Sequence, residues 1–79
     1  MSAWDKLIQS IINLDSGLRF EELKKVLERY GYEMKRPKGG SSHATFRKTG
    51  HMPITIPTKS KINVVYIEMV RDVVEGEDI

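Results

Sequence analysis

The chain has 79 residues, a net charge of +2 and no cysteine. A chain of this length forms one domain that buries about 60–65% of its unfolded surface, which leaves little room for a deep enclosed pocket. The lack of cysteine excludes disulfides and thiolate metal ligands, and two histidines among scattered carboxylates do not form a ligand set. We therefore expect a single domain, residues 1–79, that works through its surface without a metal or other cofactor.

The sequence of residues 1–17 predicts an N-terminal helix, which ends at residues 15–17. Its apolar residues recur at helical spacing; they are Trp4, Leu7, Ile8, Ile11 and Ile12. An acid lies inside this apolar stretch, no basic segment precedes it, and no small-residue cleavage site follows. The segment is therefore typical of neither a signal peptide nor a membrane span, and we expect a cytoplasmic protein with no membrane partner.

A second amphipathic helix is predicted next. Its apolar residues have the same spacing; they are Phe20, Leu23, Val26, Leu27 and Tyr30. Gly31 is a favourable helix stop, because glycine adopts the left-handed conformation found after many helix ends.

After Gly31 the apolar period changes to two, which predicts strands over residues 32–37, 43–48 and 53–57. Asn63 is a plausible N-cap for a last helix over residues 64–75, although its many β-branched residues also suit a strand. The predicted fold is α+β, a three-stranded antiparallel meander covered on one face by helices.

Charge is distributed unevenly along the chain. Residues 34–67 contain seven Lys and Arg and no acid, whereas the flanks contain six Lys and Arg and all eleven acids. A one-sign block in the middle of a small domain indicates a polyanion partner, because lysine and arginine release counterions when they neutralise phosphates. The alternative is a basic face that is merely solvated.

The predicted strand 43–48 places His43 in this basic block. Alternation puts Ala44, Phe46 and Lys48 on one face, and His43, Thr45 and Arg47 on the other. If Phe46 packs against the helices, His43 and Arg47 point outward side by side, where they can meet a phosphodiester.

Histidine can accept or donate a proton near neutral pH. Metal-free RNA cleavage needs a base for the attacking 2′-hydroxyl, cations for the developing charge and an acid for the leaving oxygen. His43, Arg47 and a lysine would provide most of this set. No Ser-His-Asp triad is indicated, because Ser41 and Ser42 suit a turn and the region has no acid to orient His43. Two alternatives stay open: a non-catalytic RNA-binding module in which His43 contacts a phosphate or 2′-hydroxyl, and a basic surface that docks an acidic protein.

The segment RFEELKKVLERYGYEMKRPKGGSSHATFRKTGHMPITIP resembles the HicA toxins of type II toxin–antitoxin systems. The likeness lies in the F-x-E-L helix, the G-S-H-x-x-F motif and the T-[IV]-P strand. It implies an α-β-β-β-α core over residues 18–75 with a double-stranded-RNA-binding-domain-like fold, preceded by residues 1–17 as a helical extension. It also implies an endoribonuclease that cleaves mRNA, with His43 as the catalytic residue, Ser42 and Phe46 in the motif's serine and aromatic positions, and a HicB-like antitoxin as partner.

The sequence departs from the family pattern at the motif itself. Ala44 stands where many members have a second histidine, and residues 39–42 form a longer turn than the family's G-S.

Further contacts to RNA are predicted in and around the basic block: Lys35, Arg36, Lys38, Ser42, Thr45, Arg47, Lys48, Lys59 and Lys61. Thr55 is expected outward on the last strand. His51, in a predicted turn, is a weaker candidate for the general acid, because it would have to reach across the sheet edge. Trp4 and Tyr66 lie on apolar stripes and suit the core better than a base-stacking role.

Overall fold

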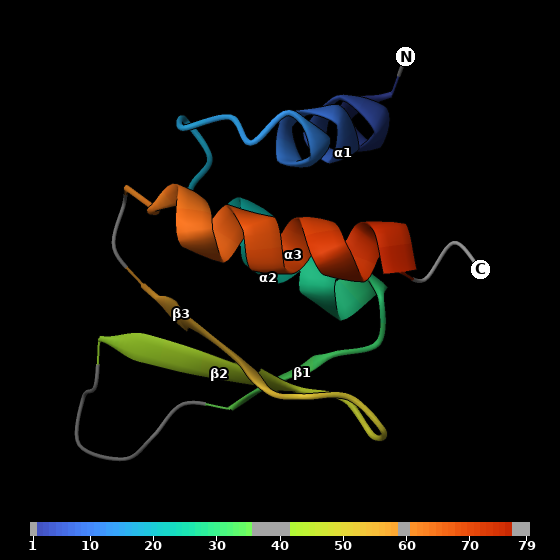
Figure 1. Ribbon diagram of the computed structural model, residues 1–79, viewed down its shortest axis with the longest axis vertical. Helices are drawn as coiled ribbons and strands as arrows, with labels where there is room; N and C mark the ends of the chain where they lie inside the picture. Colours follow the sequence, from blue (N-terminus) through green and yellow to red (C-terminus); the bar gives the residue numbers. More distant parts are fainter. Residues whose placement is uncertain (1, 36–41, 59–60, 77–79) are drawn as a thin grey trace.

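A computed structural model gives the structure of the protein and describes residues 2–35, 42–58 and 61–76. Its elements, in chain order, are α1 (Ala3–Ile12), α2 (Phe20–Arg29), β1 (Glu33–Lys35), β2 (His43–Arg47), β3 (Ile54–Pro57) and α3 (Val64–Gly76). Figure 1 shows α2 and α3 on one side of the sheet, with α1 beyond α3. The predicted α+β class with a three-stranded antiparallel sheet is confirmed.

The sheet has the order β1-β2-β3, and both pairs of neighbouring strands are antiparallel. All three strands are shorter than predicted. Tyr32 precedes β1, Lys48 follows β2 and Pro53 precedes β3, while residues 36 and 37 lie outside the described part of the chain. The predicted meander is therefore present, with β2 as its central strand.

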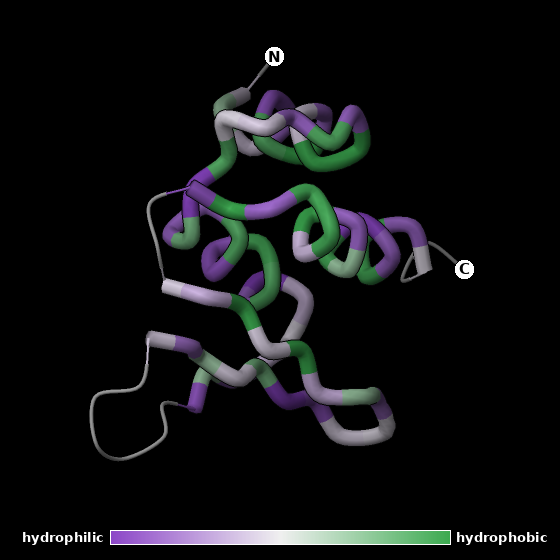
Figure 2. Tube along the Cα trace, turned by 60° about the vertical axis from the view of Figure 1, so that its left-hand side comes forward, coloured by the Kyte–Doolittle hydropathy of each residue, from purple (hydrophilic) through white to green (hydrophobic). Residues whose placement is uncertain are grey.

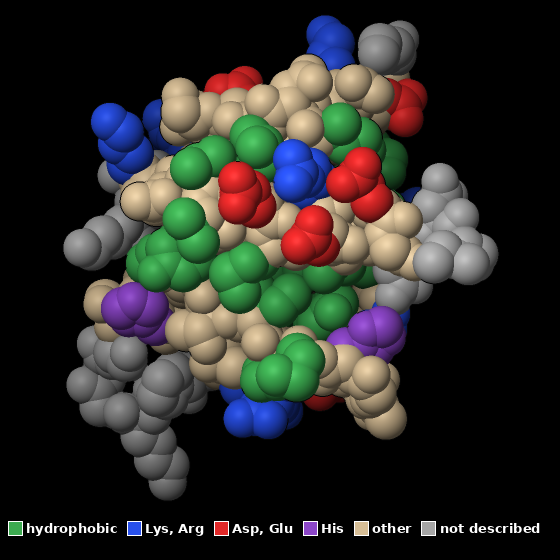
Figure 3. Space-filling model, in the orientation of Figure 1, with side chains coloured by type: hydrophobic (Ala, Val, Ile, Leu, Met, Phe, Trp, Pro, Cys, Tyr) green, Lys and Arg blue, Asp and Glu red, His purple; other side chains and the backbone are tan. Residues whose placement is uncertain are grey.

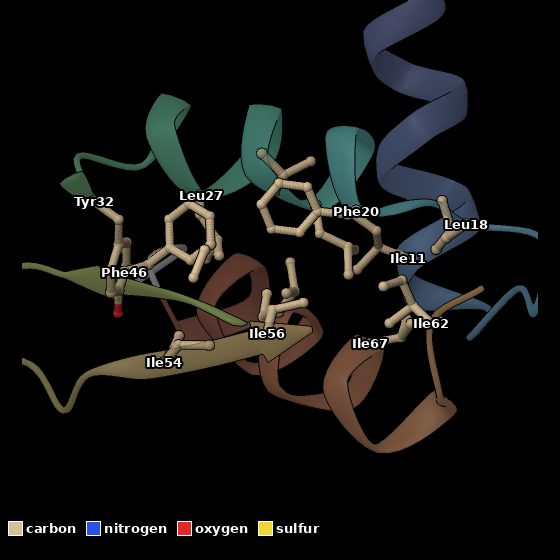
Figure 4. Packing of buried hydrophobic residues seen from close by; sticks show 14 of the residues in the cluster. Ile11, Leu18, Phe20, Leu27, Tyr32, Phe46, Ile54, Ile56, Ile62 and Ile67 are labelled. Atoms are coloured by element: carbon tan, nitrogen blue, oxygen red, sulfur yellow. The ribbon is translucent and has the colours of Figure 1, made fainter. Parts of the chain in front are cut away.

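The core lies between the inner face of the sheet and the helices (Figure 4). Phe46 of β2 is fully buried, and its ring centroid lies 6.1 Å from that of Phe20 on α2. Figure 2 shows hydrophobic and hydrophilic segments recurring along each helix, as expected for amphipathic helices. The buried residues of the three helices and the sheet include Ile11, Leu23, Val26, Leu27, Ala44, Ile54, Ile56, Ile67 and Val70.

Helix α1 packs against α3 and contributes the fully buried Ile11 to the core. The helix ends at Ile12, earlier than the sequence predicts. Asn13 is its C-cap, and Leu14 adopts a left-handed conformation with φ 56°. A non-glycine residue in this conformation costs about 1–2 kcal/mol, and the packing of Leu14 against the core offsets part of that cost.

The end of α2 matches the prediction and positions β1. Gly31 has φ 94°, the Tyr32 N–H donates to the Leu27 carbonyl at 3.0 Å, and the Gly31 N–H donates to the Glu28 carbonyl at 3.1 Å. These two bonds form a Schellman motif, which satisfies carbonyls that the helix leaves without a partner. The chain therefore leaves α2 in a fixed direction, with the buried Tyr32 at the start of the sheet.

The start of α3 also matches the prediction. The Asn63 side-chain oxygen accepts a hydrogen bond from the Val65 N–H at 3.0 Å, as an N-cap does. Trp4 and Tyr66 are both partly buried against the core. The Arg29 guanidinium carbon lies 5.3 Å from the centroid of the Trp4 ring, so this indole packs within the domain.

Candidate nucleic-acid interface

The outer face of the sheet carries the residues that the sequence singles out on β2. His43 and Arg47 are exposed and Thr45 is half-buried, whereas Ala44 and Phe46 between them are fully buried. This is the predicted alternation, in which side chains of one parity pack on the helices and those of the other face away. Solvent therefore reaches His43 on the side of the sheet opposite the helices.

The register of the three strands sets the neighbours on this outer face. Thr45 lies between Lys35 on β1 and Thr55 on β3, and its Oγ1 is 3.1 Å from Oγ1 of Thr55. Thr55 is exposed, as expected. One lysine and two threonines thus form one row across the centre of the sheet, and their side chains can donate hydrogen bonds to phosphate oxygens.

Hydrogen bonds to the end of β3 hold the backbone next to His43. The Ser42 carbonyl accepts from both the N–H and the hydroxyl of Thr58, at 2.7 and 2.9 Å. The pairing of His43 with Pro57 continues this contact into the sheet. Ser42 Oγ lies 3.4 Å from Nδ1 of His43, so the serine of the motif touches the imidazole directly. The first residue of β2 is therefore anchored although its side chain is exposed.

His43 and Arg47 share the outer face but are not side by side, which corrects the sequence prediction. They occupy opposite ends of β2, and four residues of strand span about 13 Å. Among the cations on the described parts of the three strands, Lys35 is the nearest to His43 by register, because its partner Thr45 is two residues from His43. Such diagonal neighbours are about 7–8 Å apart, so Lys35, rather than Arg47, is placed to act with His43 on one phosphate.

The other predicted contacts are not all on this face. Lys61 is exposed between β3 and α3. Lys48 follows the end of β2 and is half-buried, with Nζ 5.7 Å from the centroid of the Tyr32 ring. The remaining predicted contacts, Arg36, Lys38 and Lys59, lie outside the described residues, as does Ser41.

Glu33 lies on the same face, although the charge pattern of the sequence does not single it out. Glu33 pairs with Arg47 in the register and forms an exposed ion pair with Lys35 at 3.6 Å. The acid-free block begins one residue later, at Met34, so a charge count along the chain misses this carboxylate. Two-residue alternation in the first predicted strand does place Glu33 and Lys35 on one face, and that signal would have found it.

His51 lies at the other end of the sheet from His43. It belongs to the turn between β2 and β3, where its ring centroid is 6.1 Å from that of Tyr32. The two histidines appear on opposite sides of the molecule in Figure 3. Because His43 begins β2 and His51 follows its end, the two imidazoles are too far apart to act on the same phosphate, and a general-acid role for His51 beside His43 does not fit.

Neither a metal site nor a membrane span is found in the described part of the chain. Within residues 2–35, 42–58 and 61–76, no three His, Asp or Glu side chains are grouped so that they could hold a metal ion. No helix formed by those residues is long and apolar enough to cross a membrane.

Comparisons of the chain with protein-family models, with curated proteins and with solved structures found no match.

Proposed function

We propose that the protein is a metal-independent endoribonuclease that cleaves mRNA, with His43 as the proton-transfer residue. The observation that carries the proposal is the placement of His43: an exposed imidazole at an anchored strand end, beside a row formed by one lysine and two threonines. The motif residues Ser42, His43 and Phe46 support it, because Ser42 contacts the imidazole and Phe46 fixes the inner face of the same strand.

The proposed reaction uses the 2′-hydroxyl of the RNA as nucleophile. His43 removes the proton as the 2′ oxygen forms a bond to the adjacent phosphorus, and the bond from phosphorus to the 5′ oxygen breaks. Water at this exposed strand end protonates the leaving oxygen. Lys35 and the threonine hydroxyls stabilise the charge that builds on the phosphate oxygens. The products are a 2′,3′-cyclic phosphate and a 5′-hydroxyl.

A toxin of the HicA type accounts for this combination of features. The order α2-β1-β2-β3-α3 agrees with the α-β-β-β-α core of a double-stranded-RNA-binding-domain-like fold. In this proposal the substrate is cytoplasmic mRNA, and the natural inhibitor is a HicB-like antitoxin that covers the outer face of the sheet.

One observation favours a second candidate, an RNA-binding module without catalysis. The described imidazole and carboxylate groups that could give a second proton-transfer residue are not placed beside His43: His51 is at the far end of the sheet, and Glu33 pairs with Arg47. On this alternative, His43 contacts a phosphate or 2′-hydroxyl and the same cations hold the backbone.

The two candidates differ in whether RNA is broken. Purified protein is incubated with end-labelled single-stranded RNA in EDTA, and the product ends are identified. Fragments with 2′,3′-cyclic phosphate ends support the nuclease. Intact RNA that is nevertheless bound in a salt-sensitive way supports the binding module and rejects the nuclease. A variant with Lys25→Ala, on the exposed face of α2, serves as the control for nonspecific effects of removing a charge.

A further inference from the structure

A hollow lined by cations lies toward the end of the sheet remote from His43, and one of these cations, Lys35, is also the diagonal neighbour of His43. The hollow has a volume of about 460 Å³. Lys35, Arg47 and Lys48 line it, together with His51 of the β2–β3 turn. Glu33 is the one acid among the lining residues that the structure describes, so the three cations outnumber it.

The turn that forms one wall of the hollow has a fixed geometry. The His51 N–H donates to the Lys48 carbonyl at 3.0 Å, and Gly50 has φ 83°. A glycine with positive φ at the third position is the requirement of a type II turn. The turn therefore fixes the separation of the Lys48 and His51 backbones.

The buried ring of Tyr32 supports both of these side chains. The Lys48 ammonium lies 5.7 Å from the centroid of this ring, and the His51 ring lies 6.1 Å from it. Tyr32 is itself held by the Schellman motif at the end of α2. Two of the cationic or protonatable groups of the hollow are thus positioned before any ligand arrives, which lowers the entropy cost of binding an anion.

We propose that this hollow binds a backbone phosphate of the RNA substrate, separate from the phosphate that His43 attacks. The inference rests on the proposed function and adds a second contact to it. Arg47 is about 13 Å from His43 along β2. One strand of duplex DNA presents a phosphate about every 3.4 Å along its axis, and on that scale about four nucleotides separate the two phosphates. Lys35 lines the hollow and is also the diagonal neighbour of His43, and the RNA backbone therefore follows β2 from His43 to the turn.

The first test measures binding without cleavage. A short RNA that is 2′-O-methylated at every position cannot be cleaved by its own hydroxyl, and its affinity is measured by fluorescence anisotropy over a salt series. The double variant Arg47→Gln with Lys48→Gln is expected to reduce the salt slope by about 0.7, the value for one phosphate contact on a single strand. A matched double variant, Lys6→Gln with Lys25→Gln, removes the same charge from exposed helix positions and is expected to leave the slope unchanged.

The second test locates the phosphate. A series of oligonucleotides carries one ribonucleotide as the cleavable site and one neutral methylphosphonate, moved one position at a time. Neutralising the phosphate in the hollow is expected to slow cleavage severalfold in the wild type, at one position within about four nucleotides of the cleaved bond. The same substitution should have a smaller effect in Arg47→Gln, because this variant removes one of the three cations of the hollow and leaves the contact between Lys48 and Tyr32 in place.

The outcomes separate this inference from the function on which it rests. Cleavage that depends on His43, with a salt slope and a phosphate scan unaffected by the Arg47 and Lys48 variants, overturns the second phosphate site and leaves the nuclease. A salt slope that depends on Arg47 and Lys48, in a protein that cleaves no RNA, rejects the nuclease and supports the site. Binding of an acidic peptide in place of RNA, lost in the same variants, also overturns the inference.

Discussion

The structure assigns alternate side chains of β2 to a buried and an exposed face. Substitutions at two neighbouring positions of the strand test this assignment. Phe46 is fully buried against Phe20, whereas Arg47 is exposed. Replacement of a buried phenylalanine by alanine costs about 3–5 kcal/mol. A 79-residue domain has a total stability of about 4–12 kcal/mol, at about 0.05–0.15 kcal/mol per residue. Phe46→Ala should therefore remove much or all of the free energy of unfolding.

Two further variants make this prediction quantitative. Phe46→Leu keeps an apolar side chain and should cost about 1–2 kcal/mol, which leaves a folded protein to measure. Arg47→Ala, on the other face, should change the stability by no more than about 0.5 kcal/mol.

Urea unfolding followed by circular dichroism, with the fluorescence of the single tryptophan as a second probe, gives all three values. A larger loss in Arg47→Ala than in Phe46→Leu would refute the assignment of faces, because a one-residue shift of the strand exchanges its buried and exposed side chains.

Three other substitutions test local features that position the site. Gly31→Ala should lower the free energy of unfolding by about 1–2 kcal/mol in urea denaturation, because its φ of 94° is unfavourable for a residue with a Cβ atom, and Gly31→Asn should lower it less. Asn63→Ala removes the N-cap of α3 and should cost about 1 kcal/mol in the same assay, whereas Asn63→Ser should restore most of it. Thr58→Val removes the hydroxyl that donates to the Ser42 carbonyl and should lower the free energy of unfolding by about 1 kcal/mol. Slower cleavage with an unchanged KM would identify Thr58 as a positioning residue. Unchanged cleavage would contradict that role.

Elements with strong local signals could be predicted from the sequence. The apolar spacing of Phe20, Leu23 and Leu27 indicates α2, and Gly31 indicates where it ends, because only a residue that tolerates positive φ forms the Schellman motif easily. Two-residue alternation on β2 likewise assigns Phe46 to the inner face and His43 to the outer face. In each case the pattern lies within one element.

Other features could not be read in this way. Helix α1 also ends in a Schellman motif, in which the Asp15 N–H donates to the Ser10 carbonyl at 2.9 Å and the Leu14 N–H donates to the Ile11 carbonyl at 3.0 Å. The left-handed residue is Leu14 and not a glycine, so the sequence does not indicate this end.

The position of Lys35 diagonally beside His43 follows from the register of β1 on β2. That register is fixed by the tertiary packing of the strands. The sequence therefore shows that the cations form one block along the chain, but it does not show which of them are neighbours in space. The separation of His43 from Arg47, by contrast, follows from their four-residue spacing along one strand, and the sequence pattern already contains it.

The most direct test of the proposed function compares the wild type with His43→Ala in single-turnover cleavage of single-stranded RNA in EDTA, with RNA affinity measured in parallel. If His43 transfers the proton, the rate should fall by about 10²–10⁴, the range for general acid–base catalysis, while the affinity changes only a few-fold. A variant that cleaves at the wild-type rate, or that loses cleavage only because it no longer binds RNA, would contradict the assignment of His43 as the proton-transfer residue.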